Sequence, residues 1–268
     1  HDQALATFEK AESLALELND VEELTSATTN IAVEKRYMGE YNKALEAILE
    51  ALGIREELGL NYTVLLNNLA NIYYDIGEYQ LASEYFDKAL ARSEKLQWLI
   101  ERGMILGDYA KLYLSEGHVS KAKKLLQESL AYYEESGAEV GLVEKLCLDV
   151  ELHIAEGDLE EAKVILAKAK ELAVKHRSML EQQQCQLTSA LLEKSAENYG
   201  NARSILIELL EDAEDYEFFE IHINTCLALA ELYLERYQWK QLSNHFKAAQ
   251  KYLDEAERLS KQAKLVPK

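Results

Sequence analysis

Apolar residues in the stretch Leu65–Ala89 recur at steps of three and four residues, the spacing of one face of an α-helix. The first half carries its apolar stripe at Leu66, Leu69, Tyr73 and Ile76. The second half carries a small–large–small stripe at Ala82, Phe86 and Ala89. Between them stands Gly77, which can enter the left-handed conformation that ends a helix without a steric penalty. The stretch therefore predicts two short helices joined by a turn.

The same pattern recurs along almost the whole chain, with a period of about forty residues. The turn glycine is found at Gly39, Gly77, Gly117 and Gly157. An alanine follows five positions later, at Ala44, Ala82, Ala122 and Ala162. The fifth copy keeps its alanine but has Glu197-Asn198 at the turn, where we expect asparagine to tolerate the left-handed conformation. Coupled positions that recur in this way predict stacked helix hairpins with one continuous core.

These repeats resemble tetratricopeptide repeats over nearly the whole chain. The residues that carry the resemblance are Leu69, Ala70, Tyr73, Gly77, Tyr79, Ala82, Phe86 and Ala89. The units are longer than the usual repeat of about 34 residues, and the proline that commonly ends a unit is missing. This longer variant resembles the repeats of kinesin light chains, bacterial peptide-sensing regulators and the sensor arrays of STAND-type ATPases. The resemblance implies an all-α fold: a right-handed superhelical solenoid of antiparallel helix hairpins.

We expect one solenoid over residues 1–268, as a piece of a longer protein, because His1 falls inside the second helix of a hairpin. Residues 1–18 are predicted to form an orphan second helix. Hairpins are predicted to follow at about 21–58, 62–96, 100–136, 140–176, 179–213 and 217–264.

The last hairpin departs from the period, because Leu242 stands where alanine is expected. A small–large–small stripe comes seven residues later, at Ala249, Leu253 and Ala256. Seven residues are about two helical turns, which keeps the buried face in phase. We therefore expect a long first helix through Trp239 and a final helix over about Lys247–Lys264.

Composition narrows the function. A formal net charge of −19 disfavours nucleic acid as a partner, although acidity also serves solubility. The sequence has no run of about 18 apolar residues, so we expect no membrane span. The three scattered cysteines Cys147, Cys185 and Cys226 suggest a reducing, cytoplasmic location rather than a disulfide scaffold.

Motifs for catalysis or metal binding are missing from the sequence. It has no phosphate-binding GxxxxGK[ST] loop, no HExxH and no paired CxxC, and its histidines are isolated. The many Glu pairs fit solvated helix faces better than acid–base machinery. We expect no enzyme activity, no cofactor and no metal site.

The polar arc of the first helices is the candidate site. Asn68 is matched one repeat earlier by Asn30 and one repeat later by Asp108. The other members of the candidate site are Asn67, Asn71, Tyr74, Arg36, Tyr37 and Lys111. The family resemblance implies that these helices line a concave surface whose asparagines grip the backbone of a peptide. In the alternative, Asn30 and Asn68 bond neighbouring helix ends, whereas Asn67 and Asn71 have less structural reason to be there.

The favoured function is a protein-protein interaction scaffold that binds a peptide or a partner helix. An alternative is a ligand-sensing segment of a larger signalling protein, such as a STAND ATPase or a transcriptional activator. A third is self-association through the terminal helices, in which the basic end Lys240–Lys268 meets an acidic surface. A lysine clamp for C-terminal carboxylates, as in chaperone-tail binders of similar fold, is not expected. Thr29, Asn67, Gly107 and Cys147 occupy the corresponding positions.

Overall fold

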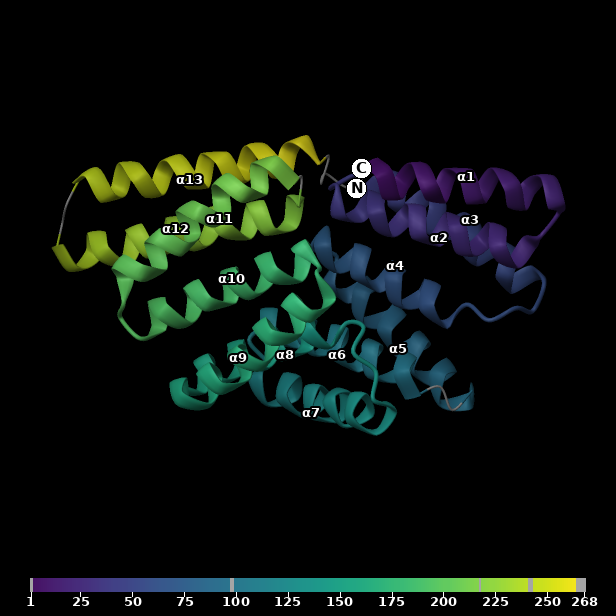
Figure 1. Ribbon diagram of the computed structural model, residues 1–268, viewed down its shortest axis with the longest axis horizontal. Helices are drawn as coiled ribbons and strands as arrows, with labels where there is room; N and C mark the ends of the chain where they lie inside the picture. Colours follow the sequence, from purple (N-terminus) through teal and green to yellow (C-terminus); the bar gives the residue numbers. More distant parts are fainter. Residues whose placement is uncertain (1, 97–98, 217, 241–242, 264–268) are drawn as a thin grey trace.

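The computed structural model describes residues 2–96, 99–216, 218–240 and 243–263, and over this part the chain is helical with no strand. The helices are α1 (Asp2–Leu18), α2 (Val21–Tyr37), α3 (Tyr41–Glu57), α4 (Thr63–Asp75), α5 (Tyr79–Leu96), α6 (Leu99–Ser115), α7 (Val119–Ser136), α8 (Leu142–Glu156), α9 (Leu159–His176), α10 (Met179–Ser195), α11 (Tyr199–Tyr216), α12 (Phe219–Lys240) and α13 (Ser243–Gln262). Each even-numbered helix packs against the odd-numbered helix that follows it, and successive pairs stack (Figure 1). This confirms the predicted all-α solenoid of helix hairpins.

The turns between the paired helices from α2 to α11 use the left-handed conformation at one fixed position. Gly39, Gly77, Gly117 and Gly157 have φ values of +74°, +82°, +78° and +81°. In the turn between α10 and α11 the left-handed residue is Glu197, with φ of +61°. Glu197 stands at the position of the glycine in the other turns, so the expectation that Asn198 adopts the left-handed conformation is wrong. The amide of Asn198 instead donates to the carbonyl of Glu193 at 2.9 Å.

In α5 the predicted small–large–small stripe forms the buried side of the helix. Ala82, Phe86 and Ala89 are fully buried. In α13 the predicted stripe is wrong at its large member, since Tyr252 is buried between Ala249 and Ala256 while Leu253 is exposed. The helix also begins at Ser243 rather than Lys247. The predicted helix end at Lys264, and position 242, lie outside the described residues.

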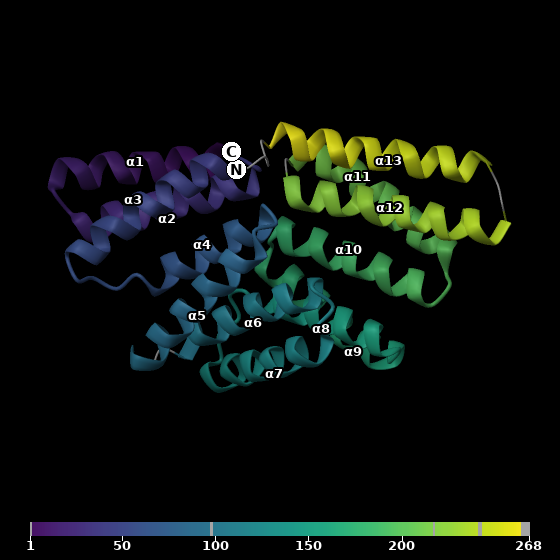
Figure 2. The same ribbon diagram turned by 180° about the vertical axis from the view of Figure 1, so that it is seen from behind.

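The arc of hairpins returns on itself, so that the start of α1 and the end of α13 lie near each other in both views (Figures 1 and 2). The Phe219 ring, at the start of α12, packs against the hydrophobic core formed by α2 to α6, and Ala263 is buried in the same core. A Cβ atom on Gly39 would lie only 2.8 Å from Cδ1 of Phe219. The two ends of the solenoid are therefore in contact, and the first helices face a common interior.

No helix in the described ranges is both long enough and apolar enough to cross a membrane.

Candidate ligand-binding face

Asp108 on α6 is the centre of a buried polar cluster. Its Oδ2 accepts hydrogen bonds from Nδ2 of Asn67 at 2.7 Å and from Nδ2 of Asn71 at 2.8 Å. Its Oδ1 accepts from the ammonium of Lys145 on α8. The cluster joins three successive first helices, α4, α6 and α8. Asn67 and Asn71 therefore have a structural role, contrary to the expectation that they have less structural reason to be there than Asn30 and Asn68.

Lys145 reaches this cluster because the helix beside it has no side chain in the way. A Cβ atom on Gly107 would lie 2.6 Å from Cδ of Lys145. A glycine inside a helix costs about 1 kcal/mol relative to alanine. At Gly107 this cost leaves the space that the Lys145 side chain occupies. Burial acts to lower the pKa of Lys145, but the carboxylates of Asp108 and Glu144 outweigh it and raise that pKa. The buried lysine therefore stays charged.

Arg36 on α2 and Asp75 on α4 form a second ion pair, with Nε and Oδ2 2.5 Å apart and Nη2 and Oδ1 3.2 Å apart. Burial raises the pKa of Asp75 to about 6, although the Arg36 guanidinium opposes the shift. The same guanidinium lies 5.6 Å from the ring centroid of Tyr37. This two-bond geometry fixes the position of Arg36.

Lys111 on α6 links the middle of the array to its far end. Its Nζ lies 3.0 Å from Oε1 of Glu220 on α12 and 3.9 Å from Oε1 of Glu144. The ammonium also lies 5.3 Å from the ring centroid of Tyr74, within reach of a cation–π interaction. Lys111 lowers the pKa of Glu220, while Lys145 and Lys111 outweigh burial and lower the pKa of Glu144 to about 2. Both carboxylates are thus ionised at neutral pH.

Glu151, two helical turns beyond Glu144 on α8, is the unmatched acid of this group. It makes no hydrogen bond or ion pair with any residue that the structure describes. Burial raises its pKa to about 7; Lys111 opposes that shift and Glu220 adds to it. We call the set Arg36, Tyr37, Tyr74, Asp75, Lys111, Glu144, Glu151 and Glu220 the inner face. It holds four carboxylates against two cations.

The predicted site residues separate into three groups. Asn67, Asn71 and Asp108 are used by the fold, whereas Arg36, Tyr37, Tyr74 and Lys111 belong to the inner face. Asn68 is half-buried and Asn30 is exposed, and neither forms a hydrogen bond within the described part of the chain. The residues that sequence reasoning missed are Asp75, Glu144, Lys145, Glu151 and Glu220.

A signal for Glu151 was present in the sequence. Asn71, Lys111 and Glu151 stand at the same place in three successive repeats, six residues before Gly77, Gly117 and Gly157. Side chains at equivalent positions of a stacked array follow one another along one face. Glu220 offers no such signal, because its approach to Lys111 depends on the closure of the arc.

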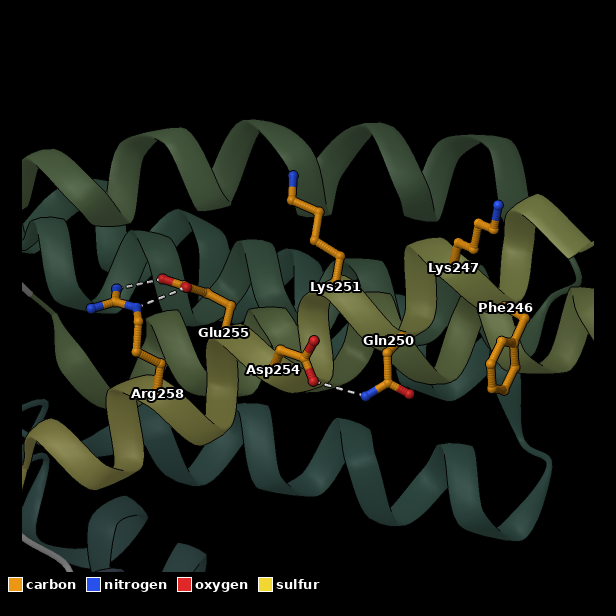
Figure 3. A pocket seen from close by; sticks show the side chains of 7 residues that line it. All are labelled: Phe246, Lys247, Gln250, Lys251, Asp254, Glu255 and Arg258. Atoms are coloured by element: carbon orange, nitrogen blue, oxygen red, sulfur yellow. Dashed lines mark hydrogen bonds and ion pairs between the residues drawn. The ribbon is translucent and has the colours of Figure 1, made fainter.

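A surface hollow of about 480 Å³ lies elsewhere, on the outer side of α13 (Figure 3). Its lining comes from this helix alone, and Asp254 and Glu255 in it are bonded to Gln250 and Arg258 of the same helix. Functional groups from different elements do not converge there, so the inner face is the better candidate. Among the described residues no group of three or more His, Cys, Asp or Glu side chains is placed to hold a metal ion.

Comparison with solved structures identifies similar folds at low sequence identity. The Rap conjugation gene regulator of the plasmid pLS20, in complex with the Phr* peptide, has a TM-score of 0.76 and 15% identity, over 96% of this chain and 70% of that chain. Aspartyl phosphate phosphatase F from Bacillus subtilis has a TM-score of 0.69 and 18% identity over 94% of this chain. The present chain spans only 63% of the length of that protein. NprR in complex with its cognate peptide NprX has a TM-score of 0.66 and 17% identity, over 94% of this chain and 73% of that chain.

At the sequence level, no curated protein matches the chain. Residues 61–135 match the family model of the tetratricopeptide repeat. This segment contains α4, α5, α6 and all of α7 except Ser136, and it includes the stretch Leu65–Ala89 that carries the repeat pattern. The chain therefore has a helical solenoid fold similar to the folds of the Rap and NprR proteins, and the tetratricopeptide repeat is recognised over residues 61–135.

Proposed function

We propose that this chain is a protein-protein interaction scaffold, not an enzyme, whose inner face binds a peptide or partner helix that carries a cationic side chain. The observation that carries the proposal is the carboxyl of Glu151, half-buried on the inner face without a partner in the described chain. Its neighbours Lys111, Glu144 and Glu220 are already paired with one another or with Lys145. A cation from a ligand would supply the missing partner.

Other polar and aromatic residues of the first helices support a peptide rather than a small ion. Asn68 and Asn30 keep their amide groups available, and each amide has both donors and an acceptor for a peptide backbone. Tyr37 and Tyr74 add aromatic surface from α2 and α4. Two proteins of similar fold were solved with peptides bound, Phr* and NprX, which favours the same class of ligand here.

Replacing Glu151 by Gln is expected to weaken the binding of a lysine- or arginine-containing peptide by about tenfold or more. A charge-assisted hydrogen bond contributes roughly 1.5–3 kcal/mol, and about 1.4 kcal/mol corresponds to a factor of ten. The measurement is a screen of capped peptides on an array, followed by titration calorimetry of the best binder with native and Glu151→Gln protein. Glu160→Gln on the exposed side of α9 is the matched control and should bind like the native protein. Equal affinity of all three proteins, or selection of acidic peptides, would reject the proposal.

The affinity for such a peptide is expected to rise with pH across neutrality. Burial raises the pKa of Glu151 to about 7, so this carboxyl is mostly neutral near pH 6 and mostly ionised near pH 8. An acetylated, amidated arginine peptide does not titrate in this range. Asp75, with its pKa at about 6, is the other inner-face group that can contribute. Titration at several pH values should show a rise in affinity that Glu151→Gln flattens, and a pH-independent affinity in the native protein would contradict the assignment.

A further inference from the structure

Two of the three cysteines meet between neighbouring first helices. The Sγ atoms of Cys147 on α8 and Cys185 on α10 are 3.8 Å apart, although 38 positions separate the two residues along the chain. Both side chains are buried and share one hydrophobic core. Although the three cysteines belong to different repeats along the chain, two of them are therefore neighbours in space.

The two thiols are chemically unequal. The hydrogen bond with Cys185, together with burial, raises the pKa of Cys147. The same hydrogen bond and the nearby ammonium of Lys170 lower the pKa of Cys185. These directions fit a pair in which Cys147 keeps its proton and donates to the sulfur of Cys185. The thiolate is the reactive form of cysteine, so Cys185 is the better nucleophile of the pair.

We propose that Cys147 and Cys185 form an oxidation site, in which a hydroperoxide converts the two thiols into a disulfide that joins α8 to α10. The sulfur of Cys185 attacks one oxygen of hydrogen peroxide, so that an S–O bond forms, the O–O bond breaks and the leaving hydroxide is protonated to water. The sulfur of Cys147 then loses its proton and attacks the sulfenic sulfur of Cys185. The S–S bond forms, the S–O bond breaks and a second water leaves. Two thiols and one peroxide thus give one disulfide and two waters.

The geometry makes this bond accessible with small movements. A disulfide needs its sulfurs at about 2.05 Å, so the pair must close from 3.8 Å. Rotation about the Cα–Cβ bonds and a slight approach of two helices that already pack together supply this movement. Hydrogen peroxide is small enough to reach the pair during local opening of the repeat.

The disulfide would also act on the inner face, an effect that rests on the proposed function. Cys147 lies three residues after Glu144 and four residues before Glu151, so it shares one side of α8 with both carboxyls. Pulling this side of the helix toward α10 displaces the acidic residues from Lys111. Oxidation is therefore expected to change peptide affinity.

The test treats the reduced full chain with hydrogen peroxide, blocks the remaining thiols and maps the products by mass spectrometry. We expect a loss of two hydrogens, one cross-linked peptide that joins Cys147 to Cys185, an unmodified Cys226 and a higher melting temperature that dithiothreitol reverses. The proposal is overturned if all three thiols survive, if the cross-link involves Cys226, or if Cys185 is oxidised beyond sulfenic acid without forming a cross-link.

Cys226, buried in a different core, supplies the control. Cys226→Ser should keep the cross-link, whereas Cys147→Ser and Cys185→Ser should lose it. The mapping on the native protein decides the proposal even if a serine variant folds poorly. Because no ligand is present during the mapping, its outcome is separate from that of peptide binding. A cross-link without any effect on peptide binding would contradict only the expected effect of oxidation on the inner face, and the oxidation site itself would stand.

Discussion

Lys145→Met is expected to lower the free energy of unfolding by about 3–5 kcal/mol, the usual cost of removing one partner from a buried ion pair. Only 4% of the Lys145 side chain is exposed, and its ammonium lies against Asp108 in the centre of the array. Methionine preserves most of the side-chain volume, so the lost stability comes from the missing charge and hydrogen bonds. Asp108 would keep its bonds from Asn67 and Asn71 but would lose its cation. Urea unfolding of the two proteins measures the difference.

Lys163→Met is the matched control, because Lys163 pairs with Glu160 on the exposed side of α9. A pair of this kind contributes about 0–1 kcal/mol, so this variant should unfold close to the native protein. Adding Asp108→Asn to Lys145→Met should restore part of the lost stability, since the carboxylate that was left alone is removed. If Lys145→Met and Lys163→Met unfold at the same urea concentration, the buried cluster does not hold α4, α6 and α8 together.

The hairpins were predictable because their signals are local. Helical spacing sets the buried stripe, and a residue such as Gly77 marks the turn within the same stretch of chain. Where the local signal was ambiguous the prediction was wrong. In α13 both Tyr252 and Leu253 stand between Ala249 and Ala256 at helical spacing, and only packing against α12 decides between them.

The site was harder to predict, because its chemistry lies between repeats. An amide such as that of Asn67 looks available within its own helix, and its partner Asp108 stands 41 positions later. Comparison of equivalent positions in neighbouring repeats could have indicated such a pairing. The bond between Lys111 and Glu220 spans 109 positions and requires the whole arc to curve back. The curvature is the sum of small rotations between repeats, and no local pattern specifies it.

Gly39→Ala is expected to open the contact between the two ends of the solenoid. Gly39 has φ of +74°, so alanine there carries a left-handed strain of about 1–2 kcal/mol. The new methyl group would also lie 2.8 Å from Cδ1 of Phe219, which must move away from its packing site. Displacing Phe219 shifts Glu220, the next residue, from Lys111. We therefore expect a loss of stability greater than that from strain alone, and a larger radius of gyration in X-ray scattering.

Gly77→Ala separates the backbone strain from the clash with Phe219. Gly77 has φ of +82°, but no atom lies within 4 Å of the position that its Cβ would take. It should show the strain without any change in radius of gyration. In a Phe219→Ala background, Gly39→Ala should cost no more than Gly77→Ala, since the ring that it displaces is gone. If the two glycine variants are equal in the native background, in both stability and dimensions, Phe219 does not close the arc. In that case the two ends are held together by their other contacts, the burial of Ala263 in the core of α2 to α6 and the ion pair between Lys111 and Glu220.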